Sequence, residues 1–197
     1  LLSAFYPHGH FLDAPAASRA EIVKASGSEV VIRFHRSAKE TPQGDPADVM
    51  TEYALRDGGP FLRIKTTYRN PSSKVANAAI YDKIRADTLF RIPPAGTGDS
   101  LIYYEPWNRA AYGVVRAGGA PIRSYANPAN KTYNQDGGNR LDFPELLTKD
   151  IGARPLGEAL PLPSPIPPGG SATVEHFLIP GRHPADVQSA IASILGR

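Results

Sequence analysis

Alternation of apolar and polar residues at every second position is the dominant pattern along the chain. In residues 61–70, Leu62, Ile64 and Tyr68 alternate with charged and hydroxyl side chains, and residues 28–36 repeat the pattern. Successive side chains of a strand point to opposite faces of a sheet, so this period of two predicts strands with one buried face.

Shorter apolar stretches between Gly and Pro residues predict the remaining strands. Residues 57–60 read Asp-Gly-Gly-Pro, a turn sequence that should join residues 50–55 to residues 61–70 as a hairpin. Further strands are predicted over residues 21–25, 74–85, 88–92, 100–105, 111–117, 122–125 and 172–179. About ten short strands separated by turns are typical of a β-sandwich or barrel.

One segment has a well-formed helical pattern. In residues 184–195, Val187 and Ile191 fall on one face, Asp186 lies in the first turn and Gly196 follows as a stop. The fold class predicted from these patterns is mainly β, an antiparallel β-sandwich with one C-terminal α-helix.

Two segments lack either period. Residues 118–139 are rich in Gly, Asn and Pro and predict a long surface loop, while residues 154–170 carry six prolines. Such a Pro-rich segment is neither helix nor central strand, so we expect an extended crossover along the surface. A ligand of the PxxP type is the alternative reading of this segment. With 197 residues in all, we expect a single domain over residues 1–197.

Composition narrows the classes of function. The chain has 22 Lys and Arg against 19 Asp and Glu, a net charge of +3, and the basic residues are dispersed. Nucleic-acid binders usually cluster their basic residues, so we expect no nucleic-acid partner. The absence of Cys excludes a thiol nucleophile, a disulfide scaffold and a Cys-based zinc site.

The apolar stretches are short, and the first residue is not Met. No window approaches the ~18 consecutive apolar residues of a membrane span, so we expect none. The chain opens with Leu1, which fits either a removed signal peptide or an excised domain. We expect an extracellular or periplasmic location.

The most suggestive short motif for a metal is His8-Gly9-His10, with Asp13 close behind. Residues two apart on a strand share a face, so His8 and His10 could ligate one divalent metal. A complete site needs further ligands, and the other histidines lie in no recognisable ligand motif: His35, His176 and His183. The alternative is that these are ordinary loop histidines, and no cofactor is expected.

The densest aromatic patch contains the only Trp of the chain. Aromatic rings beside carboxylates and amides commonly hold sugars, because sugar C–H faces stack and hydroxyls form hydrogen bonds. The candidate ligand-binding residues are Tyr103, Tyr104, Glu105, Trp107, Arg109 and Tyr112. The alternative is that these aromatics fill the core or seal a sheet edge.

Catalytic signatures are lacking. The chain has no GxSxG nucleophile motif and no phosphate-binding loop. A pair of carboxylates for glycoside hydrolysis cannot be chosen from the acidic residues on or beside strands, which are Glu52, Asp82, Asp87, Glu105 and Glu175. A cluster of oxygen side chains around two glycines could suit Ca²⁺ or simply form turns: Asn134, Asp136, Asn139 and Asp142. No catalytic residue is therefore assigned, and enzyme activity stays open.

Four fragments taken in order resemble a known type of domain. They read YALRDGGPFLRIKTTYRNPSS, AIYDKIRADTLFRIPPAG, YYEPWNRAAYGVVRAGG and IPPGGSATVEHFLIPGRHPADVQSAI. Together they resemble the β-rich N-terminal accessory domain of bacterial exported proteins. That domain often precedes carboxypeptidase-regulatory-like modules and a PHP-type metal-dependent hydrolase domain of the CehA/McbA kind. The chain also resembles, more loosely, the supersandwich of galactose-mutarotase-like proteins.

The resemblance implies an accessory role. In such proteins the hydrolase site lies elsewhere in the chain, and its motifs are absent here apart from His8 and His10, whose flanks differ. The expected function is therefore a non-catalytic binding or interaction domain, with a glycan or another protein or domain of the same assembly as partner. The alternatives are a carbohydrate-active enzyme on a sandwich scaffold and a structural subunit of an extracellular assembly.

Overall fold

The computed structural model describes residues 4–7, 18–38, 47–75, 80–84, 96–119, 121–125, 139–142 and 166–197. Its strands are β1 (Ala4–Pro7), β2 (Ser18–Ala25), β3 (Glu29–Ala38), β4 (Ala47–Arg56), β5 (Leu62–Arg69), β6 (Ile80–Ile84), β7 (Gly96–Gly98), β8 (Ser100–Glu105), β9 (Ala110–Arg116), β10 (Ile122–Tyr125), β11 (Asn139–Asp142) and β12 (Ser171–Gly181). A 3-10 turn, η3, spans Ala117–Gly119, and the helix α1 spans Pro184–Leu195.

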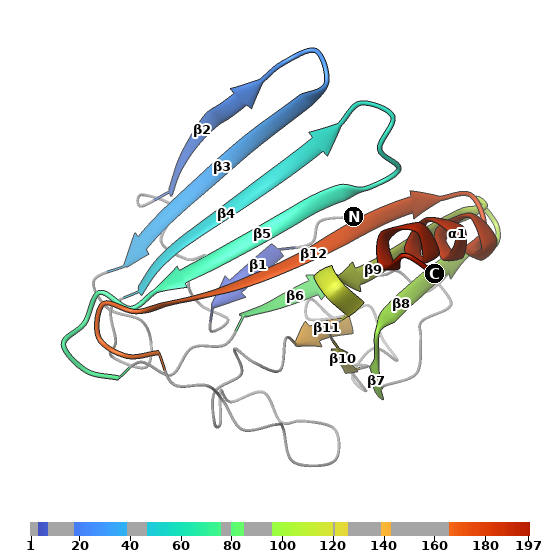
Figure 1. Ribbon diagram of the computed structural model, residues 1–197. Coiled ribbons are helices and arrows are strands. Elements are labelled where there is room, and N and C mark those ends of the chain that lie inside the picture. Colours follow the sequence, from blue (N-terminus) through green and yellow to red (C-terminus); the bar gives the residue numbers. More distant parts are fainter. Residues whose placement is uncertain are drawn as a thin grey trace.

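The described strands form two antiparallel sheets (Figure 1). The larger sheet has the order β2-β3-β4-β5-β12-β9-β8, and the smaller has the order β1-β6-β11-β10-β7. The smaller sheet lies below β12, β9 and β8 in Figure 1, whereas β2, β3 and β4 extend away from it. The predicted class, a mainly β sandwich with one C-terminal helix, is confirmed.

We call the face of the larger sheet that meets the smaller sheet its inner face. Ile122 of β10 packs there with Tyr103 and Val114 in one buried cluster. A second cluster on the same face contains Ile64 and Val174, which lie on neighbouring strands β5 and β12. Burial of such apolar side chains, at about 25 cal/mol per Å² of area, stabilises the sandwich.

The helix covers the opposite, outer face at one end of the sheet. Val187 and Ile191 of α1 are buried against Val115 of β9 and Ile179 of β12. Gly196 ends the helix in the left-handed conformation, with φ of 68°. The predicted bounds of this helix, 184–195, are confirmed.

The hairpin predicted around residues 57–60 is also confirmed. Strands β4 and β5 pair antiparallel, with Leu55 opposite Leu62 and Val49 opposite Tyr68. Along β5 the inner-face side chains from Ile64 to Tyr68 are buried and their outer-face neighbours are partly exposed. In β5, therefore, the alternation of apolar and polar residues in the sequence matches the alternation of buried and partly exposed side chains.

One strand prediction and one loop prediction were wrong in part. Of the predicted strand 74–85, Ile80–Ile84 is strand and Lys74 and Val75 are not, while residues 76–79 and 85 lie outside the described ranges. Asn139, predicted as the end of a loop, begins β11, which lies between β6 and β10 in the smaller sheet. Pairing on both sides overrides the low strand propensity of Asn and Asp.

Some predicted segments lie outside the described residues. These are the strand at 88–92, most of the predicted surface loop, residues 126–138, and most of the Pro-rich crossover, residues 154–165. The end of that crossover is described, with Ile166 buried and Gly169 in a turn at φ of 68°.

Candidate functional site

The hairpin turn between β8 and β9 carries the most exposed large aromatic side chain in the described part of the chain. Glu105 pairs with Ala110, so residues 106–109 form the turn. The Glu105 side chain is buried, and its two oxygens accept hydrogen bonds of 2.6 Å from the backbone N–H groups of Trp107 and Asn108. Hydrogen bonds to a carboxylate are among the stronger ones in proteins, so this carboxylate fixes the turn.

The same turn holds its last residue in an unusual conformation. Arg109 has φ of 51°, in the left-handed region, and it is the one non-glycine residue with positive φ in the described chain. Its side chain is exposed, and the indole of Trp107 is 85% exposed. The turn therefore presents an aromatic ring and a guanidinium on a fixed backbone.

Two of the candidate tyrosines lie in the core instead. Tyr103 and Tyr112 are opposite each other on β8 and β9, and their rings stack with centroids 4.9 Å apart and an interplanar angle of 12°. Both are buried on the inner face beside Leu101 and Val114. Their ring faces are taken up by packing, so a ligand at the turn meets neither.

The remaining candidate, Tyr104, lies on the outer face and connects the turn to the start of the helix. Its half-buried ring is 6.3 Å from the ring of His183, measured between centroids. The carboxylate of Asp186 accepts the backbone N–H of His183 at 3.0 Å and that of Arg182 at 3.1 Å. Figure 1 shows the β8–β9 turn and the connection from β12 to α1 at the same end of the sheet.

This end of the sheet therefore has two loops, each held by one carboxylate that accepts two backbone N–H groups. Their exposed aromatic, polar and charged residues are Trp107, Asn108, Arg109, Arg182 and His183. We call these five residues the turn surface. It offers one apolar ring, hydrogen-bond donors and acceptors, and positive charge, and it holds no nucleophile beside a base. The sequence pattern missed Arg182 and His183, since their place at the same end of the sheet as Trp107 depends on the pairing of β12 with β9.

Buried polar side chains occupy the inner face. His176 of β12 lies opposite Arg116 of β9, and both are buried. Burial lowers the pKa of Arg116 to about 10, because the charged guanidinium loses hydration. The guanidinium donates a hydrogen bond of 3.1 Å to the carbonyl oxygen of Pro121. These groups are closed off from solvent in this structure.

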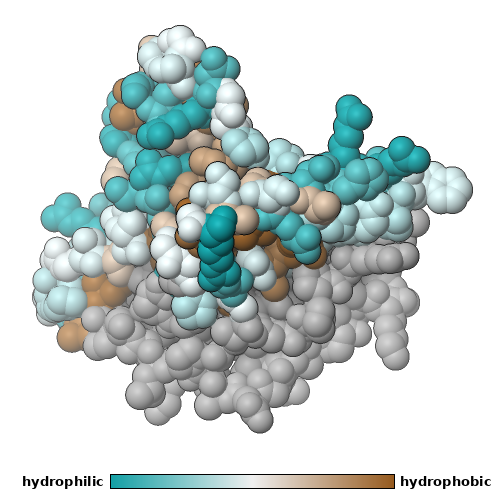
Figure 2. All heavy atoms as spheres, turned by 45° about the vertical axis from the view of Figure 1, so that its right-hand side comes forward, coloured by the Kyte–Doolittle hydropathy of each residue, from teal (hydrophilic) through white to brown (hydrophobic). Residues whose placement is uncertain are grey.

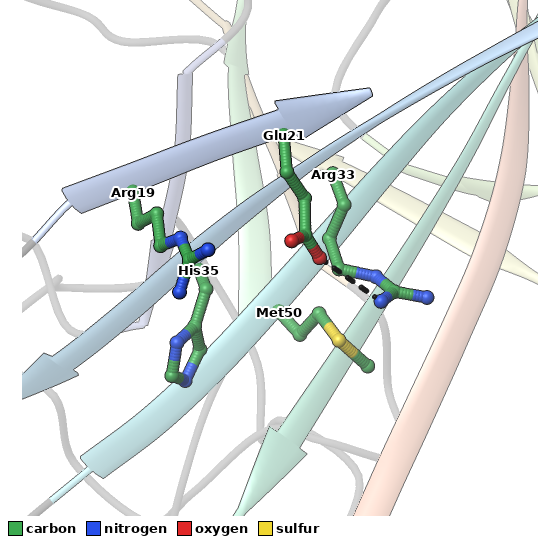
Figure 3. A pocket seen from close by; sticks show the side chains of 5 residues that line it. All are labelled: Arg19, Glu21, Arg33, His35 and Met50. Carbon is green, nitrogen blue, oxygen red and sulfur yellow. Dashed lines mark hydrogen bonds and ion pairs between the residues drawn. The ribbon is translucent and has the colours of Figure 1, made fainter. Parts of the chain in front are cut away.

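Charged residues cover the outer face of β2, β3 and β4. Arg33 bonds to Glu52 at 2.6 Å and to Glu21 at 3.1 Å, and these carboxylates raise its pKa. His35 contacts Asp48. A hollow of about 230 Å³ lies among Arg19, Glu21, Arg33, His35 and Met50 (Figure 3). Two guanidinium groups and one carboxylate line the hollow, and that carboxylate, Glu21, already bonds to Arg33, so the lining offers no free carboxylate to a cation.

The predicted metal residues His8, His10 and Asp13 lie outside the described residues, as do Asp87, Asn134 and Asp136. Asn139 and Asp142 are the first and last residues of β11. Within the described ranges, no group of three or more His, Asp or Glu side chains could hold a metal ion. No helix in these ranges is both long and apolar enough to cross a membrane.

Comparison with known proteins gives a likeness in fold alone. No family model matches the chain, and no curated protein matches it in sequence. Among solved structures it is similar to a TPR-domain containing protein from Parabacteroides distasonis, with 13% identity and a TM-score of 0.58. That match covers 87% of this chain and 36% of the other, so this chain spans about a third of that protein's length.

Sugar-related proteins are among the weaker matches. A galactose mutarotase related enzyme from Lactobacillus acidophilus is 10% identical with a TM-score of 0.43, covering 82% of this chain and 71% of that one. A polysaccharide lyase is 15% identical with a TM-score of 0.48, covering 90% and 27%. At TM-scores below 0.5 we infer neither a family nor a ligand from these matches.

Proposed function

We propose that this chain is a non-catalytic binding domain of an exported bacterial protein, and that its turn surface binds carbohydrate. The observation that carries the proposal is the exposure of Trp107 on a turn that the Glu105 carboxylate holds in place. Trp combines a large apolar ring with an N–H donor and is enriched at binding surfaces, so an indole held in solvent on a fixed turn favours a role in binding.

The chemistry of the turn surface suits a sugar. The indole face offers a flat apolar area for the C–H side of a pyranose ring. Asn108 and Arg109 flank it with an amide and a guanidinium that can bond to hydroxyl or carboxylate groups. Because the turn is fixed before binding, little conformational entropy is lost when the ligand docks.

The alternative of a carbohydrate-active enzyme has less support. Glycoside hydrolysis needs two carboxylates facing the sugar. Glu105, the carboxylate nearest in sequence to Trp107, is buried and bonded to two backbone N–H groups. Tyr103, which should line an open concave face, is fully buried.

The test uses the indole as its own probe. Trp107 is the only Trp in the chain, so its fluorescence reports the turn surface alone. We expect titration with neutral and acidic oligosaccharides to shift the emission for at least one class. On a glycan array, Trp107→Ala should lose that binding and Trp107→Phe should retain part of it.

A matched control separates a specific site from a general loss of apolar surface. Val75→Ala removes another exposed apolar side chain, 53% exposed, on a different segment, and should leave binding unchanged. If no oligosaccharide alters the fluorescence and the array stays silent, the carbohydrate proposal is wrong. Equal binding by the wild type and Trp107→Ala would place the sugar elsewhere.

A further inference from the structure

Strands β2, β3 and β4 expose an unusual amount of apolar surface. Of the eight large hydrophobic side chains exposed in the described residues, six lie on these strands: Ile22, Val23, Val30, Ile32, Phe34 and Leu55. Figure 2 shows brown, hydrophobic atoms reaching the surface among teal ones on the upper part of the molecule, where these strands lie. Exposed apolar surface gathered in one region marks an interaction site.

The outermost of these strands is an open edge. Among the described strands, β2 is the first of the larger sheet, and residues 19–25 are all exposed. A bulge interrupts its pairing with β3 between Ile22 and Lys24, so the regular part of the edge runs from Ser18 to Ile22. An exposed, regular edge offers unpaired backbone N–H and C=O groups to another strand.

One charged side chain along this edge, that of Arg19, makes no ion pair with another described residue. On the outer face, Glu21 lies opposite Arg33 of β3 and bonds to it, whereas Arg19 lies opposite His35 (Figure 3). Arg19 is the one charged side chain described on β2 and β3 that makes no ion pair with another described residue. A strand added to β2 could bring it a carboxylate.

We propose that β2 pairs with β2 of a second copy of this chain, antiparallel and centred on Ala20. In this register Ala20 faces Ala20 of the second copy, and Ser18 faces Ile22. Arg19 then faces Glu21 of the second copy, and the two-fold axis repeats that pair. The register joins two larger sheets into one continuous sheet.

Charge complementarity selects the second copy as the occupant. Residues 19 and 21 have opposite charges and lie on the same outer face, at equal distances on either side of Ala20. An antiparallel two-fold pairing about Ala20 therefore makes two attractive pairs and no repulsive one. Ile22, 69% exposed, gains contact with Ser18 and Ala20 of the second copy on the inner face.

This inference goes beyond the sugar proposal and does not depend on it. The turn surface lies at the opposite edge of the larger sheet, formed by β8 and β9. A dimer through β2 would carry two such surfaces, one at each far edge, and so bind a polymer at two points.

The first experiment tests the register by cross-linking. Since the chain has no Cys, Ala20→Cys introduces the only thiol. Side chains directly opposite in an antiparallel pair have Cβ atoms about 5 Å apart, so mild oxidation or a short bis-maleimide should give a covalent dimer. Ala25→Cys is the matched control: it is exposed on the same strand beyond the bulge and should cross-link far less.

The second experiment tests the charges by sedimentation over a wide range of protein concentration. Arg19→Glu and Glu21→Arg each place like charges opposite each other, and each should raise the dimer Kd about tenfold. An equimolar mixture of the two variants restores opposite charges in every pair and should dimerise like the wild type. High salt should weaken the wild-type dimer, because exposed charges are screened.

The outcomes are distinct from those of the sugar test. A wild type that stays monomeric at the highest soluble concentration overturns the proposal, as does equal cross-linking at positions 20 and 25. A dimer that neither charge variant weakens uses another surface, which also overturns it. Trp107→Ala should leave the dimer intact, so failure of the sugar proposal would not affect this result.

Discussion

Gly113 of β9 and Val187 of α1 lie so close together that the space between them has no room for a Cβ atom at position 113. A Cβ built at Gly113 would overlap Val187 Cγ1 and stand 3.3 Å from Ile191 Cδ1. The missing side chain therefore sets how near the helix approaches the outer face of the sheet. We expect Gly113→Ala to destabilise the protein by about 1–3 kcal/mol, as overpacking does. Urea denaturation of the two proteins measures the difference.

Two further variants locate the cause of that loss. Gly27→Ala adds the same methyl group where no atom lies within 4 Å, so it should change stability little. Val187→Ala opens space beside Gly113, so adding it to Gly113→Ala should cost less than the sum of the single changes. Strict additivity would mean that the two residues do not compete for this space.

Asn70, at the end of β5, joins that strand to the turn before β12. It is fully buried, and its Nδ2 faces the carbonyl oxygens of Lys74, Ile166 and Pro167 at 2.7–3.2 Å. Asn70→Asp replaces the donor by an oxygen that faces three others, so we expect a loss of about 3 kcal/mol or more. Thermal unfolding at pH 7 checks it.

A second variant at position 70 separates the effect of the added charge from the effect of the lost donor. Asn70→Ala removes the donor without adding a charge, and should cost less than Asn70→Asp at pH 7. Protonation lets the Asp variant donate again, so its stability relative to Asn70→Ala should improve as the pH falls. Equal stabilities of the two variants at all pH values would contradict this account.

Glu105 determines the shape of the β8–β9 turn. Its removal in Glu105→Ala leaves the N–H groups of Trp107 and Asn108 without their acceptor, and should cost about 1–3 kcal/mol. The turn should also become more mobile, which lowers the fluorescence anisotropy of Trp107. Trp107→Ala is the control for stability: its side chain is 85% exposed, so the fold should lose little. A Glu105→Ala protein with unchanged stability and anisotropy would refute the role given to this carboxylate.

Local patterns in the sequence predicted the larger sheet and the helix well, because each of these elements has one face in the core. β8 was predicted with its observed bounds, Ser100–Glu105, and α1 with Pro184–Leu195. Strand β11 was missed, since its four residues have no apolar alternation and are strand only through pairing on both sides. Tertiary pairing of this kind leaves no local signal.

The candidate site was predicted in part. The sequence pointed to the segment around Trp107. It could not tell which of the neighbouring residues Tyr103 and Tyr104 points inward, because consecutive residues of β8 point to opposite faces. It also assigned Glu105 to a ligand, whereas the carboxylate bonds to its own turn. Nor could it show that β2 is an edge, since edge position depends on the order of all strands.

The pH dependence of stability should report the hairpin between β2 and β3. Hydrogen bonds from Arg56 and Lys24 lower the pKa of Glu29 from its usual 4.5 to about 2. A carboxyl with a lowered pKa in the folded state stabilises the fold above its unfolded pKa and loses that contribution as the pH falls. For Glu29 the loss should occur between about pH 4.5 and pH 2.

Glu29→Gln should therefore be less stable than the wild type at pH 7, and the difference should vanish near pH 2. Urea denaturation across this range measures it, with Asp57→Asn as a control for removal of an exposed negative charge from the neighbouring turn. Because Asp99 and Glu175, whose pKa values are also lowered, titrate in both proteins, they cancel in the difference. A difference that stays constant with pH would show that Arg56 and Lys24 do not bind the Glu29 carboxylate in solution.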